Sequence, residues 1–193
     1  MKLDKSVFSI AVVAVLILLV VSMIFLGFFV KSETPPIEIP DDYYKCGNTL
    51  VPFRANITDC APFPIQPNDF AFEKLVLNPL VENVYILVDP HGSSGLGLSA
   101  YEIFKTLNGL LIPSGVVYTE YVENQSEVSV MSLENSSEYA PVIWLRDNQD
   151  KNLIEVTENA VIVYAKTPYD MDAAACKLAI IAINSRFDCD TEE

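Results

Sequence analysis

The chain has 193 residues, of which 51% are hydrophobic, and its formal net charge at pH 7 is −14. After residue 31, nine Lys and Arg stand against 25 Asp and Glu, so residues 32–193 carry a net charge of −16. This excess of acid argues against nucleic acid or anionic lipid as a partner, because both are bound through clustered Lys and Arg.

The most informative segment is residues 7–30, which hold 24 consecutive positions without a charged side chain. A helix of this length spans roughly 36 Å, enough to cross a hydrocarbon core of about 30 Å. Lys2 and Lys5 precede it, and acidic residues dominate after it, so the positive-inside rule puts residues 1–6 in the cytoplasm. We expect a single-pass protein of the cell membrane, anchored by residues 7–30, with an extracellular C-terminal domain.

Two alternatives compete with a retained anchor. A cleaved signal peptide would have an apolar core of about 7–15 residues and a small-residue cleavage site, whereas this run is longer and ends Leu26-Gly27-Phe28-Phe29-Val30. A pilin-like leader cut after Ser6 would leave the apolar helix as the stalk of a filament subunit. The segment lacks the acidic residue that such helices carry near their start, so a plain anchor is the preferred interpretation.

All four cysteines follow the anchor: Cys46, Cys60, Cys176 and Cys189. An even number on the oxidising side of a membrane predicts two disulfides, and three connectivities are possible. We predict nearest-neighbour pairing, Cys46 with Cys60 and Cys176 with Cys189. If the helix that contains Cys176 continues through Phe187, Cys176 must pair elsewhere, because the Cα atoms of a disulfide lie within about 7 Å.

Three Asn-x-Ser/Thr sequons also follow the anchor, at Asn56, Asn124 and Asn135. Each lies in a stretch that is polar or rich in turn-forming residues. Together they favour a glycosylated surface protein.

Composition divides the exported part into four segments. Residues 31–45 form a Pro-rich spacer, and residues 46–78 form an irregular segment held by a disulfide, with a short helix at 69–77. Residues 79–189 contain the regular α/β pattern, and residues 190–193 are an acidic tail.

The α/β pattern opens with residues 84–88, a continuous apolar run typical of a strand buried on both faces. Ser99-Ala100-Tyr101-Glu102 resembles a capping box and predicts the start of an amphipathic helix that ends at Asn108-Gly109. Residues 116–122 form the second strand. A strand–helix–strand unit of this kind implies a parallel pair with a right-handed crossover.

Three more strands and a helix complete the domain. Residues 142–146 form one strand, and residues 153–156 and 160–165 form a hairpin. Thr167-Pro168-Tyr169-Asp170 predicts a helix cap, and the helix at 171–184 is apolar almost all round. The order β-α-β-β-β-α predicts a small α/β domain with a mixed sheet. A thioredoxin-like arrangement, with Pro141 in the place of the cis-proline, is the alternative.

Three phrases carry a resemblance: Val51-Pro52-Phe53-Arg54-Ala55-Asn56, residues 77–88, and Val161-Ile162-Val163-Tyr164-Ala165-Lys166-Thr167-Pro168-Tyr169-Asp170 with the Ala-rich helix behind it. In these the chain resembles a group of uncharacterised archaeal single-pass surface proteins. The last phrase is also similar to the closing unit of archaeal surface-layer proteins. The resemblance implies an exported location and supplies no catalytic residues.

The best place for a ligand is the loop that contains His91, Gly92, Ser93, Ser94 and Gly95. It follows a parallel strand and leads into a helix, where ligands bind in open α/β sheets. It matches neither phosphate-binding glycine motif, and a single histidine cannot build a metal site. A plain connecting loop is therefore the simpler interpretation.

Other candidate groups have structural explanations. Asp170 and Asp172 face different ways on a helix, and a cap explains Asp170. Trp144 suits core packing on a central strand. We assign no catalytic, cofactor-binding or metal-ligating residue and expect no small-molecule ligand.

The expected function is a non-enzymatic interaction or structural module of the cell envelope with protein partners. The alternatives are an envelope enzyme or ligand-binding protein that uses the loop at 89–97, and a pilin-like filament subunit.

Overall fold

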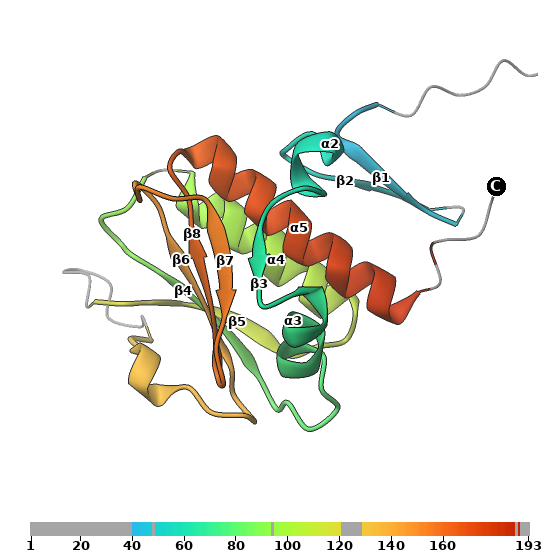
Figure 1. The fold of residues 1–193 in the computed structure, drawn as a ribbon. Coiled ribbons are helices and arrows are strands. Elements are labelled where there is room, and N and C mark those ends of the chain that lie inside the picture. The colour runs from blue at the N-terminus through green and yellow to red at the C-terminus, as the bar shows by residue number, and fades with distance from the viewer. Residues whose placement is uncertain (1–39, 48, 94, 121–128, 188, 190–193) are drawn as a thin grey trace, which may run out of the picture. The chain divides into compact units, whose positions relative to one another are not determined.

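The computed structural model describes residues 40–47, 49–93, 95–120, 129–187 and 189 (Figure 1). Within these residues, no helix is both long enough and apolar enough to cross a bilayer. The expected anchor at 7–30 lies outside the described residues, as do the tail at 1–6, most of the spacer and the acidic residues 190–193.

A six-stranded mixed sheet organises the described part, with its strands in the order β3-β7-β8-β6-β4-β5. Four strands are parallel to one another: β4 (Val84–Val88), β5 (Ser114–Tyr118), β6 (Val142–Arg146) and β8 (Ala160–Tyr164). The remaining two run the other way, β7 (Leu153–Val156) antiparallel to β8 and the short β3 (Ile65–Gln66) parallel to β7.

The two long helices, α4 (Leu96–Gly109) and α5 (Pro168–Arg186), pack against each other on one face of the sheet (Figure 1). The shorter helices within the described residues are α2 (Ile57–Cys60), α3 (Asp69–Val76) and a 3-10 turn, η1 (Leu133–Asn135). Thr167 caps α5 as predicted: its side chain accepts from the Asp170 amide, and Asp170 accepts from the Thr167 amide in return.

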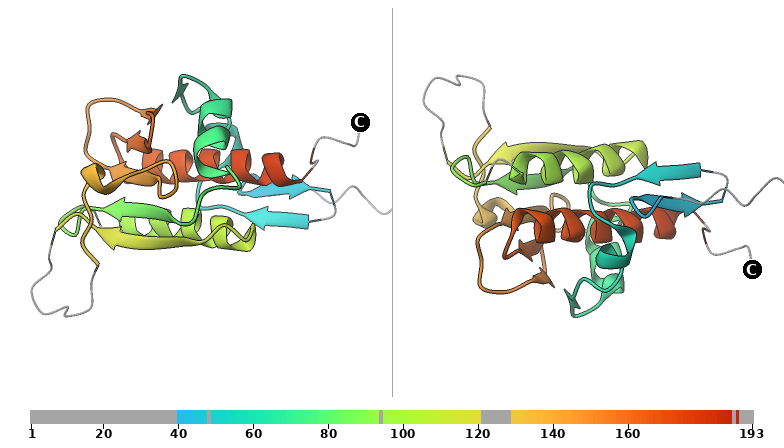
Figure 2. Two further views of the ribbon diagram at one scale, coloured as in Figure 1. Left: turned by 90° about the horizontal axis from the view of Figure 1, so that it is seen from below. Right: turned by 90° about the horizontal axis from the view of Figure 1, so that it is seen from above.

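A separate antiparallel hairpin lies against the helices, on the side away from the sheet (Figure 2). It consists of β1 (Tyr43–Cys46) and β2 (Thr49–Pro52). Tyr44 Oη donates a hydrogen bond to Asn184 Oδ1 of α5 at 2.5 Å. The C-terminal part of α5 therefore has neighbours on both sides, which explains why its sequence is apolar almost all round.

Two hydrophobic clusters hold these layers together. The larger joins the helix-facing side of the sheet to α3, α4 and α5, and it includes Phe53, Ala55, Phe63 and Phe72 from residues 46–78. The smaller lies on the opposite face of the sheet, where Leu87 and Val142 pack with the half-buried Trp144 and with residues near η1.

The predicted mixed α/β sheet and the order of its main elements are confirmed. The sequence reasoning missed three strands and α2 within residues 43–66, and β1 begins inside the predicted spacer. The marker of the thioredoxin-like alternative is absent: in the described residues the cis peptide bond precedes Pro67, not Pro141, and β6 is parallel to both of its neighbours.

The predicted capping box at Ser99 is wrong. Helix α4 begins earlier, at Leu96, so Ser99 lies within it, and its hydroxyl donates to Asp172 Oδ1 at 2.6 Å. The Ser-x-x-Glu spacing was therefore a coincidence of two residues with other partners.

The predicted disulfide pairing is also wrong. The structure joins Cys46 to Cys189 and Cys60 to Cys176, with Cα–Cα distances of 4.5 and 5.6 Å. Helix α5 continues to Arg186, so the chain cannot fold back from Cys189 to Cys176. Both bridges instead attach the segment before residue 61 to α5 and the residues just after it.

Candidate functional site

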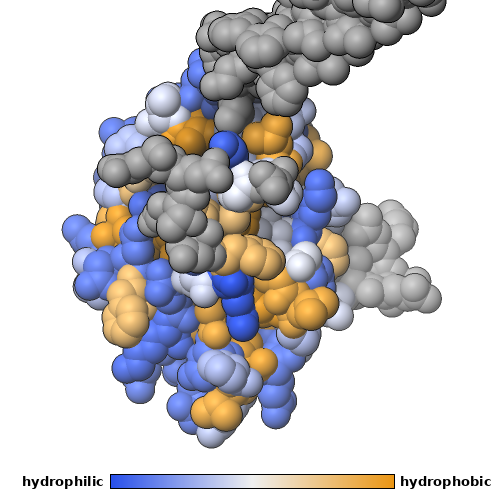
Figure 3. Space-filling model, turned by 90° about the vertical axis from the view of Figure 1, so that its right-hand side faces the viewer, coloured by the Kyte–Doolittle hydropathy of each residue, from blue (hydrophilic) through white to orange (hydrophobic). Residues whose placement is uncertain are grey.

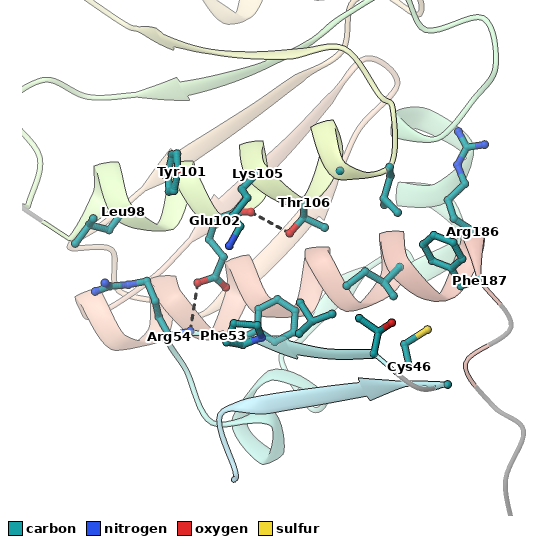
Figure 4. Close-up of a pocket in the computed structure, with 17 residues that line it drawn as sticks. Cys46, Phe53, Arg54, Leu98, Tyr101, Glu102, Lys105, Thr106, Arg186 and Phe187 are labelled. Carbon is teal, nitrogen blue, oxygen red and sulfur yellow. Dashed lines mark hydrogen bonds between the residues drawn. The ribbon is translucent and has the colours of Figure 1, made fainter. Parts of the chain in front are cut away.

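The principal pocket is a groove of about 880 Å³ between β2, α4 and the C-terminal end of α5 (Figure 4). We call it the α4–β2 groove. Its apolar lining comes from all three elements: Val51, Pro52, Phe53, Leu98, Tyr101, Leu110, Ile183 and Phe187. The polar lining includes Arg54, Glu102, Lys105, Thr106 and Arg186.

The helical period of α4 places different residues toward the sheet and toward the groove. Ala100, Ile103 and Leu107 are buried in the main core. Leu98 and Tyr101 lie on the groove side and remain 47% and 57% exposed. Large apolar side chains this exposed, side by side on one helix, are typical of an interaction surface.

On the face that carries the hairpin and the end of α5, hydrophobic side chains gather in patches between hydrophilic ones (Figure 3). Leu50 and Phe187 are among the exposed apolar residues of these two elements. The apolar surface of the groove is thus continued on the elements that border it.

A hydrogen-bonded polar cluster lies at one end of the groove. Asp172 of α5 is only 7% exposed, and its Oδ1 accepts from Arg54 Nε at 3.2 Å and from Ser99 Oγ at 2.6 Å. A buried carboxylate requires such partners, because leaving it unpaired costs several kcal/mol. The cluster fixes the chain just after β2 to both long helices.

Glu102 stands beside this cluster and points from α4 toward β2 (Figure 4). Its Oε2 accepts a hydrogen bond from the backbone N–H of Arg54 at 3.3 Å. Its Oε1 is buried without a hydrogen-bond partner among the described residues. The pKa of Glu102 is raised from 4.5 to about 7, chiefly by burial; the hydrogen bond from the Arg54 amide opposes this rise, the charge of Asp172 adds to it, and the charges of Arg54 and Lys105 oppose it.

The charge of the groove differs from that of the domain around it. Among the described residues, three Lys and Arg line it, namely Arg54, Lys105 and Arg186, against one carboxylate, Glu102; Arg54 is itself paired with Asp172 of the polar cluster. Arg54 lies at one end and Arg186 at the other (Figure 4). A ligand with an apolar body and a negative charge would match this lining.

The loop at 89–97, singled out from the sequence, does not line the groove. Asp89 Oδ1 accepts from the His91 amide at 2.8 Å, and Asp147 Oδ2, at the end of β6, accepts from the Ser93 amide at 2.7 Å. A Cβ on Gly92 would lie 3.3 Å from Asp147 Oδ1. A carboxylate of the chain thus already occupies this turn, which favours the plain connection over an anion site; Ser94 lies outside the described residues.

The other candidates are dispersed. Asp170 serves the cap and Asp172 serves the polar cluster, so the two point to different partners as expected. Trp144 lies on the face of the sheet away from the long helices, with the Arg146 guanidinium 4.7 Å from its ring centroid. No group of three His, Cys, Asp or Glu suited to a metal ion occurs among the described residues.

The sequons also separate. Asn56 caps α2, with Oδ1 accepting from the Thr58 amide, and Asn135 is exposed at η1. Asn124 lies outside the described residues. Whether these sites carry glycans stays a prediction.

Comparison of the chain with family models, with curated proteins and with solved structures gives no match. The site is therefore interpreted from its own geometry.

Sequence reasoning missed the groove, because its walls come from residues far apart in the chain. One local signal was available: Leu98 and Tyr101 are apolar residues off the buried stripe of a helix already identified as amphipathic. Which element faces them could not be read from local spacing.

Proposed function

We propose that this chain is an extracytoplasmic binding module, tethered to the cell membrane by residues 7–30, whose binding site is the α4–β2 groove. It is a non-enzymatic member of the cell envelope that recognises the apolar, negatively charged part of a partner. The interaction role expected from the sequence is kept and receives a site, the groove, in place of the loop at 89–97 that served the ligand-binding alternative.

The observation that carries the proposal is the contrast between the groove and its domain. A domain with a net charge of −16 puts a third of its cations on one apolar groove. Solubility alone favours charged residues spread over the surface, with no large exposed apolar patch. An apolar lining that also carries Lys105 and Arg186 suits a ligand of complementary character.

The polar groups of the groove favour binding over catalysis. The Ser99 hydroxyl is buried and donates to Asp172, which also holds Arg54. These groups are engaged in joining β2 to the helices, and their role is explained by that alone.

Filling the groove tests the proposal. Gly109 lines the groove, and a Cβ added there meets no atom within 4 Å; the same holds for Gly97 on the same helix, outside the groove. We expect Gly109→Leu to weaken binding of 8-anilinonaphthalene-1-sulfonate, an apolar anion, at least tenfold, and Gly97→Leu to preserve it.

The measurement is a fluorescence titration of the full-length chain in lipid nanodiscs, with the signal of empty discs subtracted. A saturable component of one site per chain should appear in the parent and in Gly97→Leu and be at least tenfold weaker in Gly109→Leu. Equal binding by all three proteins, or no saturable component in the parent, would refute the groove as the binding site.

A further inference from the structure

We infer that the groove binds an extended, acidic segment of a partner protein, which adds as a third strand to the free edge of β2. The inference rests on the proposed function, since it names the ligand class of the same groove. Addition of a strand to an exposed sheet edge is a common mode of peptide recognition, in which main-chain hydrogen bonds give affinity and alternate side chains give specificity.

The backbone N–H and C=O groups of β2 point alternately toward β1 and away from it. The Phe53 amide donates to Asp42 O at 2.7 Å, so it points toward β1. Because successive residues of a strand point their backbone groups to opposite edges, the N–H and C=O of Leu50 and the C=O of Pro52 point away from β1. In the described residues β2 pairs with β1 alone, so this second edge has no strand beside it.

The free edge of β2 faces the groove. The Arg54 amide follows the same alternation and points away from β1, and it donates to Glu102 Oε2 on α4. The free edge of β2 and the outer side of α4 are therefore opposite walls, with α5 behind them (Figure 4). Arg54 and Arg186 mark the two ends, so the groove is elongated along the strand.

Apolar side chains of α4 lie exposed between β2 and α4. The hairpin packs on α5, whereas Leu98 and Tyr101 on the neighbouring α4 stay about half exposed. A strand added to β2 would cover these side chains.

The charges at the groove indicate which kind of segment binds there. Lys105 and Arg186 at the groove favour a segment that carries Asp or Glu among its apolar residues. A second copy of this chain would bring another domain of net charge −16, and the long-range repulsion opposes such a pair. The charges therefore favour a short extended segment of a different protein over a second copy of this chain.

The test begins with a phage-displayed library of random octapeptides, selected on the full-length chain in nanodiscs and counter-selected on Gly109→Leu. We expect enriched sequences with alternating apolar positions and at least one Asp or Glu. The leading synthetic peptide is then N-methylated at each amide in turn. Methylation should weaken binding at least tenfold at two amides two residues apart, those that donate to the C=O groups of Leu50 and Pro52, and less than twofold at the others.

Charge is tested with a matched pair of variants. Lys105→Glu should weaken the peptide about tenfold, whereas Lys166→Glu, an exposed lysine outside the groove, should change its Kd less than twofold. Both variants alter the net charge of the chain equally.

Several results would overturn the inference. They are the absence of any enriched peptide, an N-methylation pattern without alternation, and equal effects of the two lysine variants. A parent that sediments as a dimer, or that binds peptide only after residues 31–39 are deleted, would assign the groove to a second copy or to the chain itself. If the fluorescent anion still binds in a Gly109-dependent manner, the groove remains a binding site and strand addition alone is rejected.

Discussion

At the scale of single residues, the polar groups of the groove show how one position can serve fold and site together. Arg54 uses its side chain for Asp172 and its backbone amide for Glu102. Glu102 was read from the sequence as half of a capping box, yet it lies in the second turn of α4 and faces another element. Its unusual pKa follows from burial, which a local motif does not reveal.

Glu102→Gln should therefore make stability less sensitive to pH. The pKa of this carboxyl rises from 4.5 to about 7 on burial, so the folded state retains the proton through that interval. Stability falls as pH rises from 4.5 to 7, and the ionised side chain costs up to about 3 kcal/mol above pH 7. Glutamine keeps an acceptor for the Arg54 amide and carries no charge.

Urea unfolding at pH 4.5 and pH 8.5 measures this difference. The variant should match the parent at pH 4.5 and exceed it at pH 8.5. Glu134→Gln, at η1 and away from the groove, controls for the loss of one negative charge. If the difference in the free energy of unfolding between the parent and Glu102→Gln is the same at both pH values, the pKa shift assigned to burial is contradicted.

At the scale of elements, α4 ends in an unexpected conformation. Gly109 is the last helical residue, as predicted, but the left-handed residue is Leu111, with φ of 60°. Its side chain is 90% exposed, directly after the groove residue Leu110. A leucine in this region of φ/ψ space is disfavoured, and glycine is the usual choice.

Leu111→Gly should stabilise the protein by up to about 1 kcal/mol, since relief of the left-handed conformation exceeds the added flexibility of the unfolded chain. Leu111→Ala is the matched control, because it removes the exposed side chain and keeps the disfavoured φ. Thermal unfolding followed by circular dichroism compares the three proteins. An equal rise in Tm for both variants would attribute the effect to the exposed side chain instead.

The elements also show what sequence patterns can and cannot supply. Strands β4 and β6 and the cap of α5 were predictable because each depends on neighbours within a few residues. The hairpin was missed although Gly47-Asn48 is a turn signal; its strands are four residues long and one contains a proline. The groove depends on which face of α4 meets β2, and that is decided by packing between distant segments.

At the scale of the whole molecule, the two disulfides make residues 46–60 part of the main domain. They span 143 and 116 residues of sequence. Closing long loops restricts the unfolded chain, and removal of such a bridge costs about 2–5 kcal/mol in small secreted domains. The Cys46–Cys189 bridge also fixes the wall of the groove formed by the hairpin.

In the double variant Cys46→Ser/Cys189→Ser, the main expected effect is weaker binding in the groove. In Cys60→Ala/Cys176→Ala, the main expected effect is a lower free energy of unfolding, because that bridge is buried in the core. Non-reducing peptide mapping of the parent first establishes the pairing, and fluorescence titration and urea unfolding then compare the variants. Mapping that recovers Cys46 joined to Cys60 would invalidate the structural pairing on which this expectation depends.

The bridge between Cys46 and Cys189 has a mechanical consequence. It joins a residue near the start of the described domain to one just beyond its last helix. Tension applied between residue 40 and the chain beyond Cys189 would pass through residues 40–46, which include β1, and one covalent bridge, while the six-stranded sheet and the two long helices lie outside that path. A domain connected in this way can be pulled from both ends while α4 and α5, which form two sides of its groove, remain outside the loaded path.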